Sequence, residues 1–189
     1  MQRTTEQPYL SILVPVYNEE DNLRELGQEL SSVLGGLSMT SEVIFIDDGS
    51  TDGSYDVISE LRARFPTVKG VRLGRNVGQT AALSAGIRHA SGELIACLDA
   101  DLQNDPRDIA RLIDKLEEGY DVVSGWRKDR KDAFLNRRLP SMFANALISW
   151  ITGVALHDYG CTLKLYRAKY LKPLKLYGEM HRFVPAFAG

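Results

Sequence analysis

Residues 94–103 read Leu94-Ile95-Ala96-Cys97-Leu98-Asp99-Ala100-Asp101-Leu102-Gln103, an apolar run followed by two carboxylates and an amide. Residues 94–98 are typical of a buried strand because all five are apolar. Side chains alternate faces in an extended chain, so Asp99, Asp101 and Gln103 are expected to point the same way. Carboxylate and amide oxygens suit Mg²⁺ or Mn²⁺, and substrate phosphates commonly complete such a site. The stretch therefore predicts a divalent-metal site that holds a nucleotide diphosphate.

Two other interpretations of this stretch stay open. Asp, Asn and Pro are ordinary loop residues, and a single Asp-x-Asp occurs often by chance. Residues 104–106 are typical of a helix start, with Asp105 as the N-cap and Pro106 in the first helical position. A calcium loop fits poorly, because Asn104 stands where glycine is needed and Ala110 where the bidentate glutamate belongs.

The composition is that of one globular domain, because the 189 residues are 44% hydrophobic and 25% charged. The net charge of −2 argues against a generic nucleic-acid-binding protein. Cys97 and Cys161 are predicted to be free thiols in a reducing cytosol. Residues 1–8 form a polar tail without a signal-peptide pattern, and the longest apolar segment, residues 142–156, is too interrupted to span a membrane.

Strand and helix patterns alternate over the first 125 residues. Strands are predicted at residues 9–16, 42–48, 68–73, 94–98 and 121–124, and helices at residues 19–34, 52–65, 78–90 and 106–118. This alternation predicts an α/β fold with a mainly parallel central sheet and helices on both faces. Ligands of such sheets bind beyond the carboxyl ends of the strands. The polar segments fall at those ends, at residues 15–19, 47–50, 75–79 and 99–101.

After Gly125 the alternation stops. Residues 126–139 hold six Lys or Arg residues against two Asp residues. Residues 143–151 are predicted to be helical, and residues 157–167 to form a pair of strands with a turn near Gly160.

Several classes of site are disfavoured by the residues at the strand ends. The first strand is not followed by G-x-G-x-x-G, and no Walker lysine loop comes after any strand. A haloacid-type phosphatase needs paired aspartates on its first strand, whereas here they come after the fourth. No Ser-His-Asp or Cys-His grouping stands at a strand end, and the three histidines lack metal-ligand spacing: His89, His157 and His181.

Four motifs at the strand ends, taken in order and spacing, resemble the family-2 glycosyltransferases, which have a Rossmann-like A-type fold. They are Val14–Glu20 (VPVYNEE), Asp47–Asp52 (DDGSTD), Arg75–Gly78 (RNVG) and Asp99–Gln103 (DADLQ). Later motifs resemble the polyprenyl-phosphate sugar transferases, the group of dolichol-phosphate mannosyltransferase and the undecaprenyl-phosphate glucosyltransferases. These are Gly125–Arg127 (GWR), Arg137–Ser141 (RRLPS), Asp158–Cys161 (DYGC) and Glu179–Pro185 (EMHRFVP).

The resemblance implies how the donor binds. Pro15, Tyr17 and Glu19 are expected to line the base and ribose. Asp48 is expected to accept hydrogen bonds from the base, although it also suits a turn cap before Gly49. Asp99 is expected to face the ribose or the metal, while Asp101 and Gln103 hold the ion on the diphosphate. Gln79 is expected among the donor-binding residues; several relatives carry lysine there, and a neutral amide does not form that charge pair with a phosphate.

The resemblance also implies how the acceptor binds. A lipid monophosphate is mostly dianionic at neutral pH, because its second pKa is about 6, so a strong general base is barely needed. Arg127, Arg138 and the Ser141 hydroxyl are expected to bring two anions together, with both arginines counted as catalytic. Asp158 is a candidate catalytic carboxylate, preferred as an orienting group. A solvated basic loop and a turn-capping Asp158 before Gly160 are the plainer alternatives.

The predicted function is inverting transfer of a hexose from a UDP- or GDP-linked sugar to undecaprenyl or dolichyl phosphate, with Mg²⁺ or Mn²⁺. Residues 9–125 form the nucleotide-sugar-binding half and residues 126–189 the acceptor-binding half. The rival hypotheses are a polysaccharide or protein acceptor, or a non-catalytic module that binds nucleotide sugars. The base, the sugar, the lipid and any homo-oligomeric state stay open.

The expected location is the cytoplasmic face of a membrane. Apolar side chains interleave the positive charge of residues 126–143, a combination that suits a surface resting on anionic headgroups. Relatives continue beyond residue 185, so we expect a soluble part of a longer, membrane-associated protein that is truncated at its C-terminus. Such a part is expected to bind nucleotide but to turn over poorly.

Overall fold

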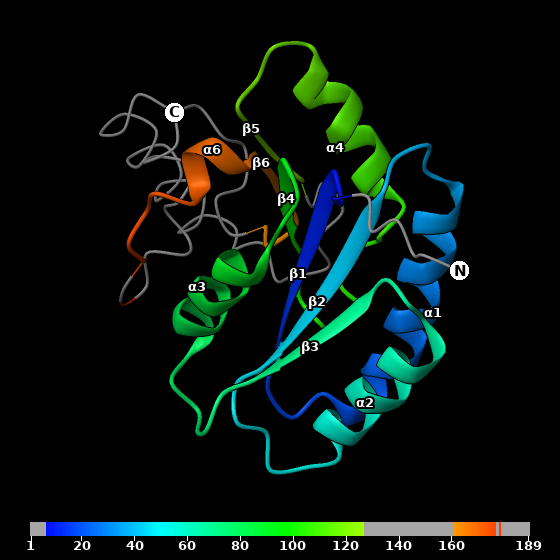
Figure 1. Ribbon diagram of the computed structural model, residues 1–189, viewed down its shortest axis with the longest axis vertical. Coiled ribbons are helices and arrows are strands. Elements are labelled where there is room, and N and C mark those ends of the chain that lie inside the picture. The colour runs from blue at the N-terminus through cyan, green and yellow to red at the C-terminus, as the bar shows by residue number, and fades with distance from the viewer. Residues whose placement is uncertain (1–6, 127–160, 177, 179–189) are drawn as a thin grey trace, which may run out of the picture.

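The computed structural model describes residues 7–126, 161–176 and 178, and its centre is a twisted sheet (Figure 1). Within those residues the sheet has six strands in the order β3-β2-β1-β4-β6-β5. The strands are β1 (Leu10–Val16), β2 (Ser41–Asp47), β3 (Val68–Arg72), β4 (Leu94–Cys97), β5 (Val122–Ser124) and β6 (Lys164–Arg167). Strands β1 to β4 pair in parallel, whereas β6 runs antiparallel to both β4 and β5.

Helices cover both faces of this sheet. The helices are α1 (Glu20–Gly36), α2 (Ser54–Arg64), α3 (Gln79–His89), α4 (Asp108–Glu117) and α6 (Ala168–Leu171). The apolar residues of α1, α2 and α4 join one core cluster, and those of α3 and α6 join a second on the opposite face. Figure 1 shows the same division, with α1 and α2 on one side of the strands and α3 on the other.

The alternation of side chains explains why β1 is apolar at most of its positions. In β1, Leu10, Ile12 and Val14 enter the first core cluster, whereas Leu13 enters the second. A strand covered on both faces reads as a nearly continuous apolar run, which is the pattern expected of a buried parallel sheet. The predicted α/β fold with a mainly parallel sheet and helices on both faces is confirmed.

Three local predictions differ from the structure. Helix α4 begins at Asp108 and not at Pro106, because residues 105–108 form a turn in which the Asp105 carboxylate accepts the Arg107 N–H at 2.9 Å. Helix α1 continues through Gly35 and Gly36, which were expected to stop it. Of the strand pair predicted at residues 157–167, residues 164–167 form β6, whose partners are β4 and β5.

The remaining fold-level expectations concern thiols and membrane spans. Neither Cys97 nor Cys161 forms a disulfide bond, as predicted. Among the residues described, no helix combines the length and the apolar character needed to cross a membrane. The apolar segment at residues 142–156, the predicted helix at residues 143–151 and residues 157–160 lie outside the described residues.

Candidate nucleotide-sugar site

A cavity of about 270 Å³ lies at the carboxyl ends of β1, β2 and β4. The chain passes from β1 through β2 to β3 on one side, and β4 then pairs with β1 on the other side. This reversal of strand order is where open parallel sheets bind their ligands. The residues that line the cavity are Pro15, Val16, Tyr17, Glu19, Asp48, Asn76, Gly78, Gln79, Ala82, Asp99, Ala100 and Asp101.

The structure brings every residue predicted to bind the donor or the metal, except Gln103, to this one cavity. All six residues predicted to bind the donor line it: Pro15, Tyr17, Glu19, Asp48, Gln79 and Asp99. Asp101, predicted as a metal ligand, lines it too. The Tyr17 side chain lines the cavity and is half exposed.

The Asp48 carboxylate joins two loops beside the cavity. Its Oδ1 accepts the Val77 N–H at 2.9 Å and its Oδ2 accepts the Gly78 N–H at 2.8 Å. Asp48 is almost fully buried, so these two charge-assisted hydrogen bonds compensate for its desolvation. Asp48 therefore anchors the loop between β3 and α3 to the end of β2.

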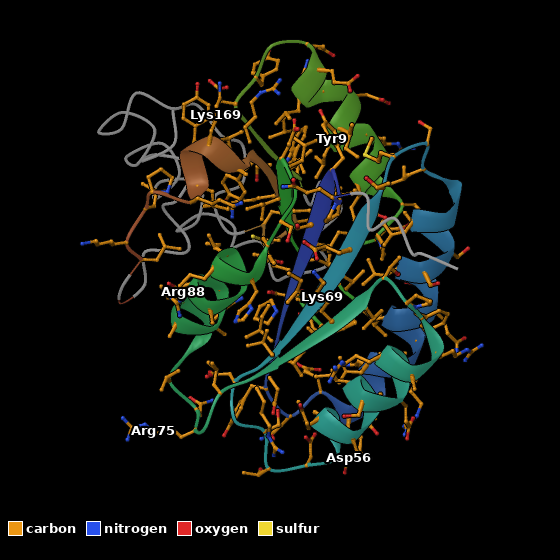
Figure 2. The ribbon with its side chains drawn as sticks, viewed as in Figure 1. Tyr9, Asp56, Lys69, Arg75, Arg88 and Lys169 are labelled. Carbon is orange, nitrogen blue, oxygen red and sulfur yellow. The ribbon has the colours of Figure 1, made fainter. Side chains whose placement is uncertain are left out.

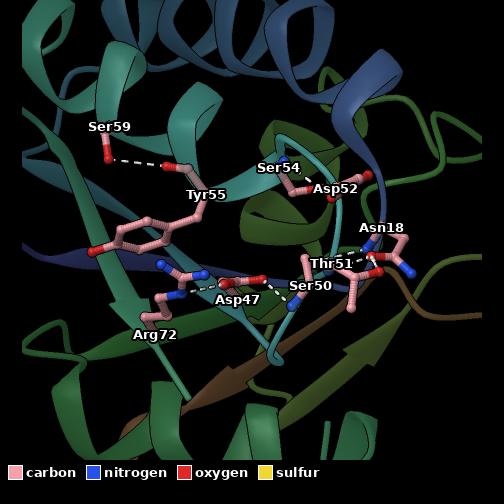
Figure 3. Close-up of polar contacts among 9 residues, drawn as sticks. All are labelled: Asn18, Asp47, Ser50, Thr51, Asp52, Ser54, Tyr55, Ser59 and Arg72. Carbon is pink, nitrogen blue, oxygen red and sulfur yellow. Dashed lines mark hydrogen bonds and ion pairs between the residues drawn. The ribbon is translucent and has the colours of Figure 1, made fainter. Parts of the chain in front are cut away.

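The neighbouring Asp47 has a structural role (Figure 3). It is fully buried, its Oδ1 accepts the Ser50 N–H at 3.0 Å, and its Oδ2 lies 3.3 Å from the Arg72 Nε. The Arg72 guanidinium in turn stacks over the Tyr55 ring, 4.5 Å from its centroid. Of the two adjacent aspartates, Asp47 holds the turn and Asp48 reaches the cavity.

Asn18 and Glu19 are held by the turn that follows β2. Asn18 has a positive φ of 56°, which its Oδ1 supports by accepting the Thr51 N–H at 2.8 Å. The Asn18 N–H donates to Ser50 Oγ at 3.0 Å and the Glu19 N–H donates to Ser54 Oγ at 2.9 Å. Figure 3 shows the Asn18, Ser50 and Thr51 side chains meeting at this turn. The backbone that carries Tyr17 and Glu19 is thereby tied to the second strand.

Gln79 reaches across the cavity from the first position of α3. Its Nε2 donates to Asp99 Oδ1 at 2.8 Å. Arg75, in the loop that precedes this helix, points away from the ribbon (Figure 2) and does not line the cavity. Gln79 therefore joins α3 to the end of β4.

The alternation expected from Asp99 to Gln103 does not continue. Strand β4 ends at Cys97, and Leu102 has a φ of 58°, which turns the chain. Gln103 is exposed, does not line the cavity, and its N–H donates to Asp101 Oδ1 at 3.1 Å. The geometric reason for including Gln103 was wrong, and its role as a ligand stays a prediction.

The donor set of the cavity fits a small divalent ion. Among the residues described, no group of three or more His, Cys, Asp or Glu side chains is arranged to hold a metal by itself. Mg²⁺ and Mn²⁺ need fewer protein ligands, because they are commonly held by one or two carboxylates together with substrate phosphates. Asp99 and Asp101 supply two such carboxylates in one cavity.

Four of the predicted residues concern the acceptor. Arg127, Arg138, Ser141 and Asp158 lie outside the described residues, so their catalytic and acceptor-binding roles stay predictions.

One residue near the site was missed from the sequence. Lys164 is buried at the start of β6, opposite Cys97 on one side and Ser124 on the other, and its Nζ donates to the Cys161 carbonyl oxygen. Burial raises the pKa of the Cys97 thiol to about 12, although the charge of Lys164 acts in the opposite direction. The feature of the sequence that points to this residue is a lysine inside the otherwise apolar run 163–166.

Comparison with known proteins places the chain in a family. The sequence profile of the family described as glycosyl transferase family 2 matches residues 11–175. The dodecaprenyl-phosphate galacturonate synthase of Rhizobium johnstonii is 48% identical over 180 residues, covering 94% of this chain and 53% of that protein. The undecaprenyl-phosphate 4-deoxy-4-formamido-L-arabinose transferase of Edwardsiella ictaluri is 40% identical over 181 residues, covering 95% of this chain and 55% of that protein.

Solved structures agree on the fold. Glucosyl-3-phosphoglycerate synthase from Mycobacterium tuberculosis, solved with Mn²⁺, UDP and phosphoglyceric acid, superposes with a TM-score of 0.68 at 18% identity, covering 87% of this chain and 58% of that one. A mannosyltransferase from Pyrobaculum calidifontis, solved with GDP-Man and Mn²⁺, superposes with a TM-score of 0.64 at 23% identity, covering 92% of this chain and 48% of that one.

The matches cover nearly all of this chain but a smaller share of its relatives. The chain spans about half the length of the curated relatives it matches. The profile match, in contrast, extends over most of the chain, from β1 to beyond α6, and includes every residue that lines the cavity. Because profile, relatives and fold agree over this whole length, the chain belongs to glycosyl transferase family 2.

Proposed function

We propose that this chain is a glycosyltransferase that moves a sugar from a nucleoside diphosphate sugar to polyprenyl phosphate. The observation that carries the proposal is the cavity in which Asp48, Asp99 and Asp101 converge at the reversal of strand order. The acceptor class is supported by the names of two relatives, which specify dodecaprenyl phosphate and undecaprenyl phosphate. A hexose remains our proposal for the transferred group.

The donor end of the cavity is suited to a nucleotide. Tyr17 offers an aromatic face for a base, and carboxylate oxygens such as those of Asp48 accept from the N–H groups of uracil or guanine. Each Asp48 oxygen bonds one backbone N–H and keeps a second lone pair for a ligand. Both a UDP-sugar and a GDP-sugar are compatible with this arrangement.

Asp99 and Asp101 would hold Mg²⁺ or Mn²⁺ beside the diphosphate. When bound, the ion supplies positive charge that offsets the negative charge developing on the departing diphosphate. The two carboxylates together with the diphosphate provide the oxygen ligands that such ions prefer.

The transfer proceeds by displacement with inversion at the sugar C1. An oxygen of the acceptor phosphate forms a bond to C1 as the bond from C1 to the nucleotide diphosphate breaks, and the electron pair leaves with the diphosphate. The acceptor phosphate is already mostly dianionic near neutral pH, so no proton has to be removed. Arg127, Arg138 and Ser141 are proposed to hold the acceptor phosphate, and Asp158 to orient it or a nearby cation.

The proposed setting is the cytoplasmic face of a membrane, where a polyprenyl phosphate presents its headgroup. The positive charge within residues 126–138 and the apolar side chains beside it support this location.

A transfer assay tests the proposal. UDP-glucose, UDP-galacturonate and GDP-mannose, each labelled in the sugar, are incubated with the chain, undecaprenyl phosphate and Mg²⁺ or Mn²⁺ in detergent. We expect label in the lipid fraction for at least one donor, and none after treatment with a chelator. Donor binding without lipid product would instead favour the non-catalytic module. Transfer to a polysaccharide or protein and not to lipid would contradict the proposed acceptor.

A further inference from the structure

We propose that Gln79 is a positioning residue for metal-dependent nucleotide binding, which it supports by fixing one oxygen of Asp99. This inference rests on the proposed function, because it concerns the carboxylate assigned there to the metal and the diphosphate. It differs from the role that the family resemblance implies for position 79, which is direct contact with the donor.

The hydrogen bond itself determines how the amide is oriented. The Gln79 side chain and the Asp99 Oδ1 are 2.8 Å apart in a half-buried part of the cavity. An ionised carboxylate can only accept hydrogen bonds, so the NH₂ end of the amide must face Asp99. One Asp99 oxygen is thus held in place from outside β4 by an uncharged donor.

The position of Gln79 is set by residues on the other side of the cavity. Gly78, which precedes α3, has a φ of 96°, and its N–H is held by Asp48 Oδ2 at 2.8 Å. The Val77 N–H is held by Asp48 Oδ1 at 2.9 Å. A continuous set of hydrogen bonds therefore runs from Asp48 at the end of β2, through the start of α3, to Asp99 at the end of β4. These hydrogen bonds fix the positions of the Asp48 and Asp99 carboxylates relative to each other.

Glutamine suits position 79 because its amide donates a hydrogen bond and carries no charge. A lysine at position 79 would also donate to Asp99, but its positive charge would neutralise the carboxylate and repel a divalent cation. Glutamine orients Asp99 without placing a positive charge beside it. Hydrogen-bond partners behind metal ligands commonly change metal affinity by about 10- to 100-fold when they are removed.

Two substitutions of Gln79 test its two effects on Asp99: methionine removes the hydrogen bond that orients the carboxylate, and lysine adds a positive charge. Gln79→Met keeps the length of the side chain and removes the donor, and Gln28→Met makes the same change at an exposed position of α1. Mn²⁺ affinity is measured by electron paramagnetic resonance in the presence of UDP and of GDP, and nucleotide affinity without metal by calorimetry. Thermal unfolding of each variant checks that the fold is retained.

We expect Mn²⁺ to bind the Gln79→Met complex about 10- to 100-fold more weakly than the Gln28→Met complex, with metal-free nucleotide affinity unchanged within about twofold. In Gln79→Lys we expect weaker Mn²⁺ binding and tighter metal-free nucleotide binding. The lysine variant carries the test independently if the methionine variant is unstable.

The outcomes distinguish this inference from the proposed function. If the unaltered chain binds neither nucleotide, with or without Mn²⁺, both proposals are overturned. If the unaltered chain binds nucleotide with Mn²⁺ and both Gln79 variants match Gln28→Met within about twofold, this inference alone is overturned. An equal loss of nucleotide affinity with and without metal in Gln79→Met would also overturn it, because that pattern indicates direct contact with the donor.

Discussion

The Asp48 carboxylate shows how one side chain can serve both the fold and the cavity. A turn cap before Gly49 was the alternative to base binding, but the carboxylate accepts the Val77 and Gly78 N–H groups, 29 and 30 residues further along. Hydrogen bonds to charged groups typically contribute about 1.5–3 kcal/mol each. Asp48 therefore stabilises the loop before α3 in addition to the role in base binding that we propose for it.

The first prediction concerns Asp101. Asp101→Ala should abolish the Mn²⁺-dependent part of UDP or GDP binding, because it removes one of the two carboxylates proposed to hold the ion. The fold should be retained, since the described contact of this side chain is with the N–H of Gln103. Calorimetry with and without Mn²⁺ measures the effect, and Asp114→Ala, at an exposed position of α4, is the control. Unchanged metal-dependent affinity in Asp101→Ala would refute the assignment.

At the scale of elements, the turn after β2 packs directly against the loop after β3. Gly49 has a φ of 69°, and a Cβ built there would lie 2.4 Å from the Arg75 carbonyl carbon. Both the backbone conformation and the space require glycine. The two loops thus meet backbone to backbone, which lets Asp48 reach the amides of the second loop.

The second prediction concerns this contact between loops. Gly49→Ala should lower the free energy of unfolding by about 2–4 kcal/mol, from the strained backbone and the backbone clash together. Gly74→Ala, in the same loop as Arg75, meets no atom within 4 Å and should change it by less than about 0.5 kcal/mol. Urea unfolding of both variants measures the difference. Equal midpoints and slopes would mean that the loops are not packed as described.

At the scale of the whole molecule, a second polar cluster ties the opposite end of the sheet together. Glu42 on β2 is buried, and its Oε1 accepts the Ser11 hydroxyl at 2.6 Å and the Ser91 N–H at 2.8 Å. Its other oxygen forms an ion pair with Lys69 on β3, a residue labelled in Figure 2. Burial alone raises the pKa of Glu42, but the hydrogen bonds from Lys69, Ser11 and Ser91 and the positive charge of Lys69 together outweigh it, so the pKa lies below its ordinary value.

The third prediction is an acid dependence of stability. A carboxyl whose pKa is lowered by folding stabilises the protein above its unfolded pKa of about 4.3, and this contribution is lost as the pH falls through the lower folded value. Glu42→Gln should therefore be less stable than the unaltered chain at pH 7, with a difference that shrinks below about pH 4. Denaturant unfolding from pH 7 to pH 3 measures it. Exposed Glu117→Gln is the control, and a difference independent of pH would contradict the prediction.

The fourth prediction concerns association with lipid. Each Lys or Arg near an anionic membrane contributes about 1 kcal/mol, so the chain should float with anionic liposomes and not with neutral ones. Replacement of Lys128, Arg130 and Lys131 by glutamine should abolish flotation, as should high salt. Flotation that is equal for both lipid compositions, or unaffected by the three substitutions, would count against a basic membrane-facing surface.

Much of the fold was predictable because the pattern of a parallel sheet is local. Alternating apolar strands and amphipathic helices identified β1 to β4 and their helices, with boundaries that differ by at most two residues. The partners of β6 were not predictable. Periodicity identifies a short apolar run as a strand, but the pairing of Lys164 with Cys97 joins residues far apart in the chain.

The sequence by itself determined which chemistry gathers at the carboxyl edge of the sheet, because parallel strands deliver their ends to the same place. Only the tertiary structure decided how those groups are connected: Asp48 with the Val77 and Gly78 amides, and Gln79 with Asp99. It also turned Gln103 out of the cavity, through the left-handed backbone at Leu102. The physical reason is that hydrogen-bond partners depend on strand order and on the path of the loops, and neither residue periodicity nor motif spacing encodes these.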